Sequence, residues 1–173
     1  MFENNVIHII VLVDVSYSMS SHIYDFVYAL NKLLVLLKNN SSIIYRITLA
    51  EFNTQLNFIK TFEHIDNIQE FTKTDFHIDG TTALYDAICN TIKYVIRKNN
   101  IVMYKTKMFI ISDGDDNASF IHNKEDTDKL TNEMIEYTGW EIIHCNTDSN
   151  LLNIPFIKYD INDISNIFDN LHI

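Results

Sequence analysis

The most constraining feature of this sequence is a nearly continuous apolar segment close to its start. Residues 6–13 read VIHIIVLV, and the segment ends at Asp14. A strand with one solvent-exposed face alternates apolar and polar residues, whereas a strand covered on both faces is apolar almost throughout. The segment therefore predicts a central strand of a parallel sheet, with helices packed against both of its faces.

The rest of the chain alternates between strand and helix patterns. Strands are expected at residues 43–52, 56–62, 107–112, 141–145 and 156–159. Apolar positions that repeat every three or four residues predict helices at residues 22–38, 82–98, 126–137 and 160–171. Thr81 or Thr82 is expected to cap the second of these helices.

This alternation is typical of α/β proteins. The connection at residues 53–55 is short enough to join its two flanking strands as an antiparallel hairpin. We therefore predict a Rossmann-like three-layer α/β/α fold, whose mostly parallel central sheet has one antiparallel edge strand. No linker or repeat divides the sequence, which predicts a single domain over residues 1–173.

The net charge limits the expected classes of partner, and the cysteine content indicates the cellular compartment. The 23 acidic residues exceed the 13 basic ones, which gives a formal net charge of -10. Nucleic acids and anionic membranes both favour basic surfaces, so neither is an expected partner, whereas a cation is compatible. No stretch has the length of a membrane helix or the form of a leader peptide, and two cysteines provide no disulfide framework. We expect a cytoplasmic protein.

Three loops of the predicted fold carry oxygen-rich side chains: residues 14–18 and 113–117 follow strands, and residues 81–82 precede a helix. In open α/β sheets, ligands bind outside the carboxyl ends of the parallel strands, where such loops meet. Carboxylates and hydroxyls without histidine or thiolate suit a hard cation such as Mg²⁺ or Mn²⁺. The three loops together therefore predict a divalent metal site, although any one of these residues alone is an ordinary cap or turn residue.

These three segments resemble the von Willebrand factor type A family. Residues 14–19 (DVSYSM) resemble the Asp-x-Ser-x-Ser motif of its metal-ion-dependent adhesion site. Residues 79–88 (DGTTALYDAI) and 110–117 (IISDGDDN) are similar to two further family segments, and all three occur in the family's order. The resemblance covers essentially the whole chain.

The resemblance implies a role for each residue of the site. Ser16 and Ser18 would bind the metal directly, and Asp14 and Asp113 would act mainly through coordinated water. Thr82 would be the third hydroxyl ligand because it precedes residues 83–84 as the family threonine does; its neighbour Thr81 is the alternative. The last coordination position would be filled by an Asp or Glu carboxylate of a partner protein.

The sequence departs from the family pattern at two positions near this site. Thr81 stands where the family has a second glycine, and Tyr17 stands where many relatives have glycine. We expect Tyr17 either to offer an aromatic anchor at the rim of the site or to pack on its own loop. Residues 20–22 (SSH) lack the acids that integrins use for an adjacent calcium site, so no second metal is predicted.

Other polar residues have simpler expected roles. Asp86 lies in a first helical turn, where the helix dipole favours an anion, and Asp115 and Asp116 are expected to be solvated acids. The strand histidines and both cysteines are expected to pack within the fold: His8, His144, Cys89 and Cys145.

A metal-dependent protein-binding module is therefore the leading functional hypothesis, with no catalytic residues. One alternative is a metal-assisted hydrolase or phosphoryl-transfer enzyme that uses Asp14. The sequence lacks both a second carboxylate at Ser16 and a glycine-rich phosphate loop, which argues against that enzyme. The other alternative is a metal-free scaffold of the same fold.

Overall fold

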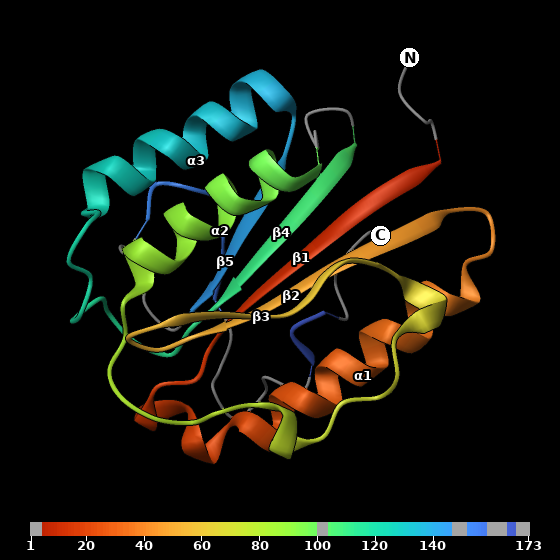
Figure 1. Cartoon of the computed structure of the whole chain (residues 1–173), viewed down its shortest axis with the longest axis horizontal. Helices are drawn as coiled ribbons and strands as arrows, with labels where there is room; N and C mark the ends of the chain where they lie inside the picture. Colours follow the sequence, from red (N-terminus) through yellow and green to blue (C-terminus); the bar gives the residue numbers. More distant parts are fainter. Residues whose placement is uncertain (1–4, 100–103, 147–151, 159–165, 169–173) are drawn as a thin grey trace.

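The computed structural model describes residues 5–99, 104–146, 152–158 and 166–168, and its centre is a six-stranded sheet. The sheet order is β3-β2-β1-β4-β5-β6 (Figure 1). The strands are β1 (Val6–Asp14), β2 (Ile44–Phe52), β3 (Leu56–His64), β4 (Lys105–Ile111), β5 (Glu141–Asn146) and β6 (Phe156–Lys158). Only the β2–β3 pair is antiparallel among the described strands, so the predicted sheet and hairpin are confirmed.

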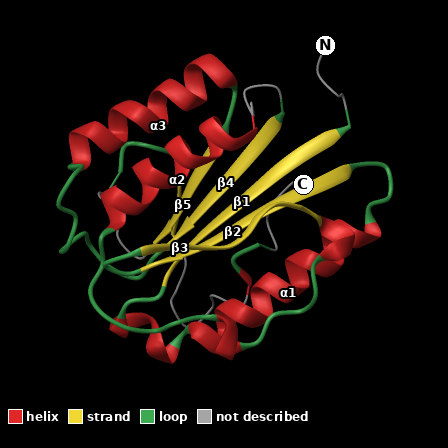
Figure 2. Ribbon diagram, in the orientation of Figure 1, coloured by secondary structure: helices red, strands yellow, loops and turns green. Residues whose placement is uncertain are grey.

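Helices cover both faces of this sheet, which confirms the three-layer prediction (Figure 2). Helix α1 (Ile23–Asn39) packs on one face, and α2 (Leu84–Asn99) and α3 (Lys124–Thr138) pack on the other. Short 3-10 helices span Tyr17–Ser21, Ile65–Asn67 and Lys73–Asp75. The helix predicted at residues 160–171 lies mostly outside the described residues.

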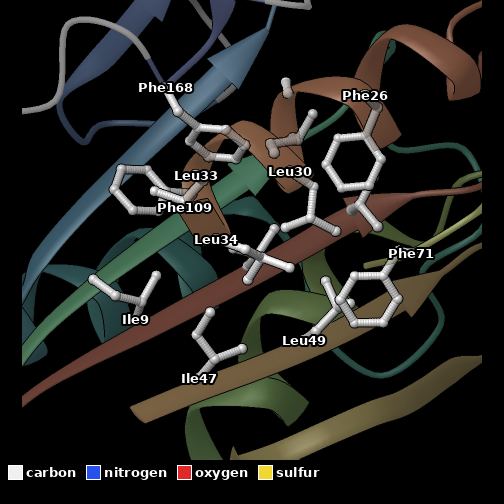
Figure 3. Close-up of a cluster of buried hydrophobic side chains, with 14 of the residues drawn as sticks. Ile9, Phe26, Leu30, Leu33, Leu34, Ile47, Leu49, Phe71, Phe109 and Phe168 are labelled. Atoms are coloured by element: carbon white, nitrogen blue, oxygen red, sulfur yellow. The ribbon is translucent and has the colours of Figure 1, made fainter. Parts of the chain in front are cut away.

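Strand β1 divides the hydrophobic core into two halves. Its odd positions Ile9, Val11 and Val13 belong to the cluster beneath α1, shown in Figure 3, whereas Ile10 and Leu12 belong to the cluster beneath α2 and α3. All five side chains are fully buried. The apolar segment therefore does what its composition predicts, because both faces of the strand need hydrophobic contacts.

The histidines and cysteines of the core are packed, as expected. Nε2 of His8 lies 2.8 Å from the hydroxyl of Thr48, and burial lowers the pKa of His8 to about 3. Burial also lowers the pKa of His144 to about 4. Cys89 and Cys145 are both buried free thiols, and burial raises the pKa of Cys145 to about 12.

Parallel pairing places the ends of the central strands at one edge of the sheet. Asp14 at the end of β1 is in register with Phe52 of β2, and Val13 is in register with Ile111 of β4. The loops that follow β1 and β4 therefore start side by side. Within the described residues, none of the helices has the length and apolar character needed to cross a membrane.

Candidate metal site

The three oxygen-rich loops lie together at this edge, as the sequence predicts. The backbone N–H of Tyr17 donates to the carbonyl of Gly80 over 3.2 Å, which joins the first loop to the second. The N–H of Asn117 donates to the carbonyl of Thr82 over 2.9 Å, which joins the third loop to the second. The backbone alone therefore fixes the three loops relative to one another.

Asp14 is the buried acid at the base of the candidate site. Its Oδ1 accepts a 2.8 Å hydrogen bond from the N–H of Ser16, and its Oδ2 accepts a 2.7 Å bond from the hydroxyl of Ser112. Burial raises the pKa of Asp14, these hydrogen bonds oppose that rise, and the nearby charge of Asp113 adds to it. Among the described residues, no basic side chain forms an ion pair with Asp14.

The remaining first-loop and third-loop residues form a chain of hydrogen bonds. The Oγ atoms of Ser16 and Ser18 lie 3.1 Å apart, and the hydroxyl of Ser18 donates to Oδ1 of Asp113 over 2.8 Å. Residues separated by 95 positions are thus in direct contact. The structure therefore brings Asp14, Ser16, Ser18 and Asp113 into one connected group.

Thr82 is held differently from the other predicted ligands. Its N–H donates to Oδ1 of Asn117 over 2.9 Å, and its carbonyl accepts from the N–H groups of Asn117 and Ala118. Thr82 is buried whereas Thr81 is exposed. Within the described part of the chain, no hydrogen bond joins the Thr82 hydroxyl to Ser16 or Ser18, so only its backbone is fixed to the site.

Thr81, which stands where the resembled family has a second glycine, follows the glycine that makes the turn. Gly80 has a φ of +70°, a left-handed conformation that glycine adopts without steric cost. Thr81 is not among the described residues with positive φ, so its side chain introduces no backbone strain. The loop therefore needs glycine at position 80 only.

The donor set fits a hard divalent cation. The described residues contain no group of three or more histidine, cysteine or acidic side chains able to hold a metal ion. The predicted set instead offers two carboxylates and three hydroxyls. Magnesium retains several waters and takes few protein carboxylates, so its coordination suits such a set. A hydroxyl that donates one hydrogen bond also keeps lone pairs for a cation.

Tyr17 lies at the rim of the candidate site. Its side chain is exposed, with a residue exposure of 66%. The neighbouring carboxylate of Asp79 raises the pKa of Tyr17. The ring is therefore exposed and not packed on its own loop, and its role as an aromatic anchor for a partner stays a prediction.

Two minor predictions about this edge were wrong. The first amides of α2 are satisfied by Asp116 and Ser119, which accept from Tyr85 and Asp86 over 3.3 and 3.0 Å, rather than by Thr81 or Thr82. Asp116 is therefore a half-buried capping residue and not a solvated acid. The cause is a long-range contact, which local helix-start patterns do not contain.

Asp86 has a larger structural role than the helix-dipole interpretation assigns to it. Its carboxylate accepts hydrogen bonds from the N–H groups of Phe120, Ile121 and His122 over 2.7, 3.1 and 2.7 Å. Nδ1 of His122 lies 3.0 Å from the same carboxylate. Asp86 therefore fixes the loop between β4 and α3 to the start of α2.

Glu51 is a buried acid that the sequence analysis missed. It lies in β2 and is in register with Val13, one residue before Asp14 in β1. Its carboxylate accepts from the side-chain amide of Asn57, from the backbone N–H of His77 and from Nδ1 of His77, over 3.0, 2.9 and 2.8 Å. An acid in a strand whose other residues are mostly apolar was the available signal.

Comparisons with known proteins support the fold. No protein-family model matches the chain, and no curated protein matches it. Among solved structures, proximal thread matrix protein 1 from the mussel byssus aligns with a TM-score of 0.66 and 15% identity, over 96% of this chain and 45% of that chain. The SpRpn10 VWA domain aligns with a TM-score of 0.63 and 10% identity, over 95% of both chains.

A further structure of the mussel protein is described as having a zinc-occupied MIDAS motif. It aligns with a TM-score of 0.56 and 15% identity, over 92% of this chain and 39% of that chain. This chain therefore spans less than half the length of the mussel protein. At these identities the comparisons establish an architecture and leave the chemistry of the site to its own residues.

Proposed function

Because this chain has a von Willebrand factor type A-like fold, we propose that it is a divalent-metal-dependent protein-binding module. The observation that carries the proposal is the hydrogen-bonded chain from Ser16 through Ser18 to Asp113, next to the buried Asp14. Hard oxygen donors from separate loops are gathered there in a group that includes two acids and contains no base.

Each residue of the group has a proposed role. Ser16, Ser18 and Thr82 would bind the cation through their hydroxyls, while Asp14 and Asp113 would balance its charge mainly through bound water. The proposed cation is Mg²⁺ or Mn²⁺, because the donors are all oxygen. The zinc-occupied motif of the mussel protein supports a divalent ion in this fold. A bound cation supplies an electrophile for an Asp or Glu carboxylate of a partner protein.

We propose binding rather than catalysis. The hydroxyls of Ser16 and Ser18 are engaged with each other and with Asp113, an arrangement that suits cation ligation. The two free, buried thiols support a cytoplasmic setting. The net charge of -10 supports a protein partner rather than nucleic acid or an anionic membrane.

Paired serine substitutions test the metal-binding part of this proposal. The double change Ser16→Ala and Ser18→Ala is expected to abolish partner capture in Mg²⁺, because it removes two hydroxyl ligands. The matched control is Ser20→Ala with Ser21→Ala, which alters exposed hydroxyls of the same 3-10 helix. Pull-down with Mg²⁺ and with EDTA should show capture only for the wild type and the control, and only in Mg²⁺.

Thermal melting separates this function from a metal-free scaffold. A cation that binds only the folded state raises stability by mass action. We therefore expect Mg²⁺ to raise the Tm of the wild type and of the control but not that of the Ser16/Ser18 variant. Partner capture that persists in EDTA and in that variant would refute metal-dependent docking.

A further inference from the structure

A groove beside α2, at the margin of the core, combines apolar and basic side chains. It has a volume of about 580 Å³ and lies between α2, the edge strand β3 and the loop that precedes α3. Phe58, Tyr94 and Ile121 provide apolar surface, and Lys93, Arg97 and Lys98 provide positive charge. No acid is among the described residues that line it, in a chain with 23 acidic residues and 13 basic ones.

Lys93 is held in position by His122, which in turn contacts Asp86. Nδ1 of His122 lies 3.0 Å from Oδ1 of Asp86, and Nζ of Lys93 lies 2.7 Å from Nε2 of His122. With Nδ1–H donating to the carboxylate, Nε2 is left as an acceptor for the ammonium group. His122 is mostly buried, with 11% of its side chain exposed, so these contacts hold Lys93 at one side of the groove.

The other two cations face solvent and are available. Arg97 and Lys98 are exposed near the end of α2, and neither forms an ion pair with the described residues. Nζ of Lys98 lies 6.0 Å from the centre of the Tyr94 ring. The groove thus presents one positive charge held by His122 and two exposed ones that form no ion pair with the described residues, beside an aromatic surface.

The aromatic surface of the groove is formed by two stacked rings from different elements. The rings of Phe58 and Tyr94 are stacked, with centroids 4.0 Å apart and planes inclined by 24°. This contact joins β3 to α2 and occupies one face of each ring. Binding of single-stranded nucleic acid relies on aromatic faces that are open to successive bases. The stacked pair instead offers its edges and remaining faces to an apolar side chain.

We propose that this groove binds an acidic peptide segment of a partner protein that carries an aromatic or large apolar side chain. The acids would pair with Lys93, Arg97 and Lys98, and the apolar side chain would contact Phe58, Tyr94 and Ile121. The net charge of -10 opposes a long polyanion but weighs less on a short segment whose charges meet the local cations. This surface is separate from the candidate metal site and does not depend on it.

Peptide binding by the full chain in EDTA tests the proposal, because EDTA removes any contribution of the metal. The probe is a fluorescently labelled peptide of glutamates around one phenylalanine. We expect saturable binding, at least fivefold weaker affinity for Arg97→Glu, and unchanged affinity for the Ser16/Ser18 double variant. The matched control is Lys129→Glu, which makes the same charge change at an exposed position of α3.

Three further probes decide between the possible outcomes. Replacement of the phenylalanine by alanine should weaken binding, since the aromatic surface then has no partner, and replacement of the glutamates by glutamine should abolish it. No binding by the wild type, or equal losses in Arg97→Glu and Lys129→Glu, would overturn the proposal. A labelled oligothymidylate that binds more tightly than the peptide would overturn it in favour of a nucleic-acid site.

Discussion

Two buried acids at the ends of neighbouring strands have opposite surroundings. Glu51 in β2 accepts three hydrogen bonds, one of them from Nδ1 of the His77 imidazole over 2.8 Å. Asp14 in β1 accepts from one backbone amide and one hydroxyl, and it has no basic partner among the described residues. Both acids are almost fully buried.

The difference supports Asp14, rather than Glu51, as the acid of the proposed metal site. A buried carboxylate is costly unless it is paired or hydrogen-bonded. Glu51 is satisfied by the chain itself, so its role is to fasten the segment around His77 to the sheet. Within the part of the chain that the structure describes, Asp14 has neutral donors only, and burial raises its pKa. A divalent cation would therefore offset the cost of burying the Asp14 carboxylate, whereas the Glu51 carboxylate already has three hydrogen-bond donors.

Of the changes considered, Asp14→Asn should have the largest effect, and the effect is on the stabilisation of the protein by Mg²⁺. The substitution keeps the shape of the side chain but removes the charge, so Mg²⁺ should no longer stabilise the protein. At a concentration 100-fold above its Kd, Mg²⁺ would add about 2.7 kcal/mol to the unfolding free energy of the wild type. Chemical denaturation with Mg²⁺ and with EDTA measures this gain; an equal gain in the variant would show that Asp14 is not part of the site.

The pH dependence of the unfolding free energy tests the raised pKa of Asp14, but the contribution of buried His8 must first be separated from it. The pKa of His8 is about 3 in the folded protein and about 6.5 in an unfolded chain, so the unfolded state binds more protons as the pH falls below 6.5. Acidification to about pH 5 should therefore cost about 2 kcal/mol through His8 alone.

Asp14 acts in the opposite direction during the same titration. Its raised pKa means that the folded state takes up a proton more readily than the unfolded state, so acid favours folding through this group. The change His8→Gln removes the histidine contribution, and the variant should lose about 2 kcal/mol less than the wild type between pH 7 and about pH 5. Denaturant unfolding at several pH values checks this; identical pH slopes would contradict it.

The change Glu51→Gln should have the smallest effect and leave metal binding intact. It replaces one acceptor oxygen by an N–H₂ group that faces a donor, at a cost of about 1 to 2 kcal/mol in unfolding free energy. The Mg²⁺-dependent gain in stability should remain equal to that of the wild type. Loss of that gain in this variant would show that the two acids act as one unit.

Much of the fold could be predicted from the sequence because its main signals are local. The apolar segment at residues 6–13 identifies the central strand, and the short turn at 53–55 identifies the hairpin. The meeting of the three loops then follows from parallel pairing, since the carboxyl ends of parallel strands share one edge. The predicted ligand set itself remains a prediction.

The contacts that hold the site in place were not predictable in the same way. Asn117 fixes the backbone of Thr82 from 35 positions away, and Asp86 fixes the amide of His122 from 36 positions away. Such pairs follow no helical or strand period, so one sequence gives no reason to choose them. The pairing of Glu51 with His77, 26 positions apart, was missed for the same reason.

The order of the strands also bears on how the protein reaches its folded state. β2 and β3 pair locally, but β1 pairs with β4, and Ile7 faces Lys105 across that long interval. Contacts between residues far apart in sequence form late and slowly, and during synthesis one edge of β1 stays unpaired until β4 has emerged from the ribosome. Asp113 follows β4 and bonds Ser18 only after that closure. Metal affinity would therefore report that the chain has finished folding, because a partly synthesised or partly folded chain does not yet bring these two residues together.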